Sequence, residues 1–189
     1  MTENPDLPDC VIKTLDAVLD KPGAAIYDPP RLDTQMKTWA QDMLSHIHTC
    51  STERTGLALL PGPLFLPDKS FKALRAAMVD DDVVEVIVAM PGGMLSDIGI
   101  PLCLWCCDKR KTRAGMVLFI DASKLGSKVD KRRVELSDEE IERIGATVAA
   151  WRSGTGYADV AGYCQSATLE DIARQNYALT PARYVASGG

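Results

Sequence analysis

The chain has 189 residues, of which 46% are hydrophobic, and a formal net charge of −5 at pH 7. This size and apolar content predict one domain with one core, and no run approaches the roughly 20 apolar residues that a membrane-spanning helix needs. The first eight residues are acidic and contain proline, unlike a secretory signal, so we expect a soluble, cytoplasmic protein with no membrane contact.

The first half of the chain alternates between helical and strand patterns. Apolar residues at helical spacing predict a helix over 9–20. A short strand over 24–27 follows, and it ends at Pro29 and Pro30 because proline has no N–H to donate to a ladder. The further elements that we expect are a helix over 34–46, a strand over 56–60, a helix over 68–78 and a strand over 83–90. Buried strands separated by helices are typical of a parallel α/β sheet.

The pattern changes after the strand over 83–90. The next strand, over 102–107, follows it with no room for a helix, so we expect the two strands to be antiparallel neighbours or nearly so. A further strand over 116–121 comes after a basic turn.

Helix signals dominate the rest of the chain. Ser137 has Glu140 at the capping-box position and predicts a helix to about residue 151, and Thr168 with Asp171 predicts a last short helix. We therefore expect two parts, which are an α/β domain over 1–136 and a helical C-terminal extension over 137–189 packed on it.

The six cysteines are too sparse and too irregular for a disulfide framework, and we expect reduced thiols. Three of them lie in the apolar strand over 102–107, where Cys103 and Cys107 point to one face and Cys106 to the other. No second cysteine pair at ligand spacing follows, and the two-residue spacing of His46 and His48 splays side chains on a helix. We therefore expect no metal site.

Positive charge is concentrated in the segment 108–133, which carries +6 while the remainder carries −11. Its cations are Lys109, Arg110, Lys111, Arg113, Lys124, Lys128, Lys131, Arg132 and Arg133. A basic segment on an acidic protein is suited to phosphate contact with strong salt dependence. The alternative is a set of solvated loops that flank a strand. Under the first interpretation, the residues that we expect to bind DNA are Lys109, Arg110, Lys111 and Arg113.

The strand over 24–27 runs into Asp28-Pro29-Pro30-Arg31. A short acidic or amide side chain followed by two prolines, at the carboxyl end of a strand, is how enzymes that methylate exocyclic amino groups hold their target nitrogen. The alternative for this motif alone is an ordinary turn at the end of a strand.

Five stretches and the end of the chain match one family in that family's order. They are AIYDPP (25–30), GLALLP (56–61), VEVIVAMP (84–91), GIP (99–101) and VLFIDA (117–122), then TLEDIA (168–173) and YALTPARYV (177–185). The chain thus resembles the modification subunits of type I restriction-modification systems, which are S-adenosylmethionine-dependent adenine-N6 DNA methyltransferases. The resemblance is to the carboxyl-terminal half of their catalytic domain.

The resemblance implies a partial Rossmann-like methyltransferase sheet, containing strands four to seven with mixed parallel and antiparallel pairing, flanking helices and a helical C-terminal tail. The double proline would end strand four, and a late antiparallel strand would insert beside strand five. The strand over 24–27 would then have an uncovered edge, which invites pairing with another chain. The loop bracketed by Gly92, Gly93 and Gly99 would lie beside the target nucleotide, where its glycines either let backbone approach DNA or only turn the chain.

The resemblance also implies catalytic roles within Asp28-Pro29-Pro30-Arg31. The Asp28 carboxylate and the Pro29 carbonyl would accept hydrogen bonds from the adenine amino group, once the base has left the duplex. In the family an aromatic residue follows the second proline and stacks on the base, and an asparagine usually precedes the prolines. Here these positions hold Arg31 and Asp28. The Arg31 guanidinium can stack on a base, but its charge opposes the charge that develops on the attacking nitrogen.

Family members bind the methyl donor with a glycine-rich turn upstream of the double proline, and only Gly23 is a glycine among the 27 residues before Asp28. We therefore expect a methyltransferase-like subunit that lacks the donor-binding half, binds no S-adenosylmethionine by itself and is inactive alone. The alternatives are a non-catalytic module that assembles with restriction-modification partners or DNA, and an unrelated α/β domain. The implied partners are DNA, specificity and restriction subunits, a donor-binding half, or a second copy through the sheet edge.

Overall fold

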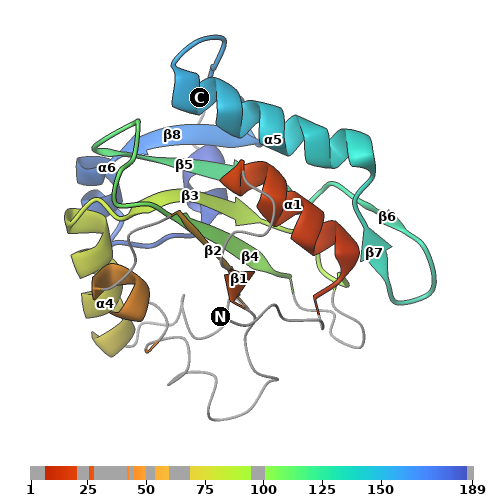
Figure 1. Ribbon diagram of the computed structural model, residues 1–189, viewed down its shortest axis with the longest axis horizontal. Coiled ribbons are helices and arrows are strands. Elements are labelled where there is room, and N and C mark those ends of the chain that lie inside the picture. Colours follow the sequence, from red (N-terminus) through yellow and green to blue (C-terminus); the bar gives the residue numbers. More distant parts are fainter. Residues whose placement is uncertain are drawn as a thin grey trace.

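A six-stranded sheet forms the centre of the computed structural model (Figure 1). The structure describes residues 7–20, 26–27, 42, 45–49, 54–59, 69–94 and 101–186. In spatial order the strands are β1 (Ile26–Tyr27), β2 (Thr55–Leu59), β4 (Cys103–Cys107), β3 (Val84–Ala89), β5 (Met116–Asp121) and β8 (Cys164–Thr168). The predicted mixed α/β class is confirmed.

Four strands run in one direction and two in the other. β1 is parallel to β2 and β3 is parallel to β5, whereas β4 is antiparallel to both β2 and β3, and β8 is antiparallel to β5. The predicted antiparallel pairing of the strands before and after the 91–101 loop is confirmed. Consequently β1, β2, β3 and β5 all end at one edge, which we call the carboxyl end of the sheet. They begin at the opposite edge, which we call the amino end.

Helices cover both faces of the sheet, so the domain has three layers. The helices α1 (Asp9–Leu19) and α5 (Asp138–Ser153) pack on one face (Figure 1). The other face packs against α4 (Lys69–Asp80), α6 (Leu169–Arg174) and α7 (Pro181–Val185). β4 contributes side chains to both faces of the sheet. Leu104 packs in the core under α1 and α5, and Trp105 packs in the core on the opposite face.

The cysteines of β4 follow the predicted alternation. Cys103 and Cys107 pack on the face that carries Trp105, and Cys106 packs on the opposite face. Burial raises the pKa of both Cys103 and Cys107 to about 12, so these thiols are neutral at physiological pH and act as small apolar side chains.

Local capping explains where the two predicted C-terminal helices begin. The Ser137 Oγ accepts from the Glu140 N–H at 3.1 Å, and the Glu140 Oε1 accepts from the Ser137 N–H at 3.0 Å. Thr168 and Asp171 form the same reciprocal pair at the start of α6. Both predicted capping boxes are confirmed.

Three elements of the structure were not predicted from the sequence. The segment after residue 137 is not only helical, since it contains β8, which joins the sheet beside β5. It also contains α7, whose Tyr184 ring stacks on Phe119 of β5 with centroids 3.9 Å apart. A small hairpin of β6 (Ser127–Lys128) and β7 (Val134–Glu135) precedes α5. The predicted helix over 34–46 lies mostly outside the described residues, and residues 45–49 are helical.

Candidate functional site

The predicted catalytic motif follows β1 in the sequence, and β1 ends at the carboxyl end of the sheet. β1 ends at Tyr27, which pairs in parallel with Leu57 of β2. Asp28, the next residue, lies outside the described residues, as do Pro29, Pro30 and Arg31. At this end the structure describes the 90–94 loop after β3, the turn after β5, the β6–β7 hairpin, and the residues that lead into the antiparallel strands β4 and β8.

The 90–94 loop is buried and held by backbone contacts. The Met90 N–H donates to the Leu102 carbonyl at 2.8 Å, and the Met90 side chain is fully buried. Gly93 has a φ of +83°, and a Cβ built on it would lie 3.1 Å from the Arg132 carbonyl oxygen. Glycine is needed there both for the backbone conformation and for the close contact. Of the other predicted target-base glycines, Gly92 lies in the same turn and Gly99 is outside the described residues.

The close approach that Gly93 permits is to the β6–β7 hairpin of the same chain. The Val134 N–H donates to the Gly93 carbonyl at 2.9 Å. The sequence left two roles open for this glycine, which were close approach to DNA and turning of the chain. Its contacts with the hairpin favour a role within the protein.

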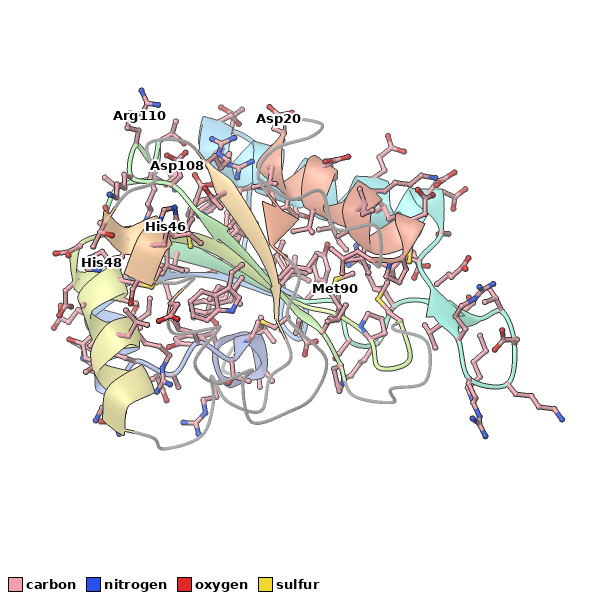
Figure 2. The ribbon with its side chains drawn as sticks, turned by 60° about the horizontal axis from the view of Figure 1, so that its bottom comes forward. Asp20, His46, His48, Met90, Asp108 and Arg110 are labelled. Carbon is pink, nitrogen blue, oxygen red and sulfur yellow. The ribbon has the colours of Figure 1, made fainter. Side chains whose placement is uncertain are left out.

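The predicted DNA-binding residues lie at the opposite end of the sheet. Because β4 is antiparallel to its neighbours, the loop that follows it emerges at the amino end, and Figure 2 shows Asp108 and Arg110 far from Met90. Lys109 and Arg110 are exposed. The Lys111 side chain is 1% exposed and its Nζ lies 2.5 Å from Asp82 Oδ1, so this cation is already paired with a carboxylate inside the protein. The structure does not bring these residues together with the glycine loop.

A buried group of charges occupies the amino end beside that loop. The Arg152 Nη2 donates to Glu85 Oε1 at 2.5 Å, and Arg54 Nε lies 3.1 Å from Asp108 Oδ2 and 3.5 Å from Glu85 Oε1. Glu85 is fully buried, and burial together with this carboxylate raises the pKa of Cys106. We call Arg54, Glu85, Asp108 and Arg152 the buried charge cluster.

The buried charge cluster fixes the C-terminal end of α1. Arg54 Nη1 donates to the Leu19 carbonyl at 2.8 Å, and Arg152 Nη1 donates to the Val18 carbonyl at 2.5 Å. These carbonyls are among the last of the helix and lack intrahelical partners. The buried charge cluster therefore links α1, α5 and the sheet, and its role is structural. The sequence analysis missed it, although Glu85 is a lone charge within an apolar strand and signals a buried ion pair.

Histidines and cysteines do not build a metal site in the described part of the chain, where no group of three potential ligands is found. His48 Nε2 instead lies 2.5 Å from Asp81 Oδ2 near the protein surface. Within the same described ranges, no helix is long and apolar enough to cross a membrane.

The comparisons with known proteins agree on one family. The model of the family described as N-6 DNA Methylase matches residues 25–188. The methylase subunit of the type I restriction enzyme HindI from Haemophilus influenzae is 34% identical over 90% of this chain and 38% of its own length. The MjaIX methylase subunit from Methanocaldococcus jannaschii is 31% identical over 73% of this chain and 25% of its own length. The chain thus spans well under half of these relatives.

Solved structures of similar proteins share the fold at low sequence identity. A type I restriction-modification methyltransferase subunit from Streptococcus thermophilus matches 70% of this chain and 26% of its own, with a TM-score of 0.62 and 23% identity. The M protein of the type I restriction enzyme EcoKI matches 82% of this chain and 42% of its own, with a TM-score of 0.62 and 9% identity.

Proposed function

Because the chain belongs to the N-6 DNA methylase family, we propose that it forms the acceptor-base part of an adenine-N6 DNA methyltransferase within a type I restriction-modification system. The observation that carries the proposal is the strand order β1-β2-β4-β3 with β4 antiparallel. This order supports the proposal, because a late antiparallel strand inserted beside strand five is what we expect of the methyltransferase fold. Asp28 directly follows Tyr27, the last residue of β1, and β1 ends at the same edge of the sheet as β3, which the 90–94 loop follows.

In the proposed chemistry, the Asp28 carboxylate and the Pro29 carbonyl accept hydrogen bonds from the adenine amino group. The amino lone pair is delocalised into the ring, so these contacts orient the nitrogen and raise its electron density. The base must leave the duplex to reach the site, and contacts in the pocket must offset the few kcal/mol that unstacking costs. Arg31 stacks on the base in place of an aromatic ring, which lowers the rate because its charge opposes the developing positive charge on nitrogen.

The methyl donor of the family is S-adenosylmethionine, and the described residues do not fit it. A nucleoside-binding turn joins a strand to a helix through glycines that admit close backbone approach. The glycine pair after β3 is followed by the antiparallel strand β4 and not by a helix. The hairpin already packs against Gly93, so a ligand cannot approach the backbone there. We therefore propose that a donor-binding half supplies that site. It docks beside β1, the terminal strand of the described sheet, and the assembly also includes specificity and restriction subunits.

Methyl transfer tests the proposal directly. The full chain alone is expected to transfer no methyl group to duplex DNA, and addition of a donor-binding half from a family member is expected to restore transfer to adenine N6. Asp28→Ala should then lower the restored rate by about 100-fold, the size of effect seen when one preorganised hydrogen-bonding group is removed.

Asp28→Asn is the matched control for that loss, because its amide oxygen accepts the same hydrogen bond. It should retain most of the restored rate. Restored methylation that is indifferent to Asp28→Ala would refute the role of the carboxylate, and stoichiometric S-adenosylmethionine binding by the chain alone would refute the division into two halves.

A further inference from the structure

The β6–β7 hairpin carries the most exposed positive charge at the carboxyl end of the described sheet. Figure 1 shows it extending beyond the rest of the described structure, on the opposite side from α4. The segment 124–135 holds five exposed cations against two carboxylates, Asp130 and Glu135, on a protein whose net charge is −5. Its cations are Lys124, Lys128, Lys131, Arg132 and Arg133.

Both carboxylates of the hairpin are engaged within it. Asp130 Oδ1 accepts from the backbone N–H groups of Arg132 and Arg133, each at 2.9 Å, and these hydrogen bonds lower the pKa of Asp130. Glu135 Oε1 lies 3.3 Å from Arg133 Nε. By contrast, the side chains of Lys128, Lys131 and Arg132 form no hydrogen bond or ion pair within the described ranges. Three cations are therefore free to meet an external anion.

The hairpin is anchored to the loop that we predicted to lie beside the target base. Besides the hydrogen bond from Val134 to Gly93, the Gly126 N–H donates to Glu140 Oε2 at 2.7 Å, which fixes the base of the hairpin to α5. A Cβ on Gly126 would lie 2.8 Å from Val134 Cγ1, so the packing there is tight. The tip is closed by a hydrogen bond from the Val129 N–H to the Arg133 carbonyl at 2.9 Å. Such an ordered arm loses little conformational freedom when it binds.

From this arrangement we infer that the β6–β7 hairpin is a phosphate-binding arm for duplex DNA, with Lys128, Lys131 and Arg132 as its contacts. The inference rests on the proposed function, which brings a flipped adenine to Asp28 at the same end of the sheet. Contacts to backbone phosphates position a duplex without reading its sequence. The cations of the hairpin thus hold the DNA beside the base site, whereas Lys109 and Arg110 lie at the amino end, away from it.

The experiment measures duplex binding by the full chain from about 50 to about 200 mM salt, where the slope of log affinity against log salt counts phosphate contacts. The triple variant Lys128→Gln, Lys131→Gln, Arg132→Gln should reduce that slope by about 2.7, since each lost contact is worth about 0.9. The matched control Lys72→Gln, Arg174→Gln, Arg183→Gln removes the same charge from exposed positions on α4, α6 and α7 and should leave the slope unchanged.

Two outcomes would overturn the hairpin assignment. One is an equal salt slope for the triple hairpin variant and the unmodified chain. This outcome includes the case in which the unmodified chain shows no salt-dependent binding. The other is a loss of slope in Lys109→Gln, Arg110→Gln while the hairpin variant binds normally. Methyl transfer tests the proposed function and the salt slope of duplex binding tests the hairpin, so failure of one measurement is distinguishable from failure of the other.

Discussion

Three cations at the amino end of the sheet and the hairpin cations at its carboxyl end are used in different ways. At the amino end, Arg54, Arg152 and Lys111 are paired with carboxylates inside the fold. At the carboxyl end, the hairpin cations Lys128 and Arg132 are exposed, and the carboxylate between them is held by backbone N–H groups. For Lys111 the difference arises from what its loop packs against, because its loop and the hairpin both belong to the basic segment 108–133. Arg54 and Arg152 come from outside that segment.

This comparison separates stability from recognition. A buried cation that pairs with a carboxylate is already engaged inside the fold and is not available to a ligand. An exposed cation, beside a carboxylate that backbone N–H groups already hydrogen-bond, adds little to stability and is available to phosphate. Changes at the amino end should therefore act on unfolding. Changes at the carboxyl end should act on DNA contact and local order.

The largest expected effect is at the amino end. Glu85→Ala removes the carboxylate that Arg152 pairs with and leaves Arg54 paired with Asp108 alone, and removal of one partner from a buried pair costs about 3–5 kcal/mol. Urea unfolding with linear extrapolation measures this loss.

The matched control for that change is Glu170→Ala, whose carboxylate pairs with Arg174 at a site where the side chains are 76% and 66% exposed. Such a pair contributes less than about 1 kcal/mol. Equal losses in the two variants would show that the buried charge cluster does not stabilise the fold.

A smaller effect is expected where the hairpin meets the 90–94 loop. Gly93→Ala puts a side chain on a residue with φ of +83° and brings its Cβ to 3.1 Å from the Arg132 carbonyl oxygen. Gly115→Ala has the same kind of backbone strain, with φ of +76°, and nothing within 4 Å. Each change should cost about 1–2 kcal/mol for the left-handed conformation.

The difference between the two glycine variants isolates the contact with the hairpin. Gly93→Ala should be less stable than Gly115→Ala in thermal or urea unfolding, and it should also weaken duplex binding because the arm is displaced. If Gly115→Ala proved the more damaging variant, the hairpin would not be anchored as described.

The smallest effect concerns the pH dependence of the hairpin tip. Hydrogen bonds from the backbone N–H groups of Arg132 and Arg133 lower the pKa of Asp130 in the folded protein. A lowered folded pKa means that the carboxylate contributes stability above its unfolded pKa, and that this contribution is lost as pH falls through the folded value. The tip should therefore stay ordered at neutral pH and loosen only in acid, below the usual aspartate pKa of about 4.

An NMR titration of the Asp130 carboxyl group and of the amide groups of Arg132 and Arg133 measures this shift. Asp130→Asn keeps an acceptor oxygen and removes the titration, so the amide shifts should lose that pH dependence. A carboxyl midpoint at or above the usual aspartate value would contradict the proposed hydrogen bonding at the tip.

Sequence patterns predicted the elements whose causes are local. The capping boxes at Ser137 and Thr168 act within four residues, and the apolar runs of β3, β4 and β5 are buried on both faces, so each is visible in a short window. β8 was missed because its sequence, Cys-Gln-Ser-Ala-Thr, is mostly polar, and it is a strand only through its pairing with β5.

The candidate site was predicted in part. The sequence located the glycine turn at Gly92 and Gly93, while the structure does not describe Asp28 and its neighbours. The sequence also located the basic segment but could not separate its two loops. Lys111 looks like an exposed cation in the sequence, and its partner, Asp82, lies 29 residues away. The hairpin carries one usable signal, an aspartate followed by Lys-Arg-Arg, which favours a tight, positively charged turn.

The amino-acid sequence by itself determined the family and the local elements, because motif order, helix caps and apolar runs are properties of residues close together in the chain. Only the tertiary structure decided where the charged loops lie. β4 is inserted antiparallel to its neighbours, so the loop that follows it emerges at the amino end of the sheet, while the loop that follows β5 emerges at the carboxyl end. Strand direction depends on pairing between segments that are distant in the sequence. That pairing places the two loops of the basic segment 108–133 at opposite ends of the sheet.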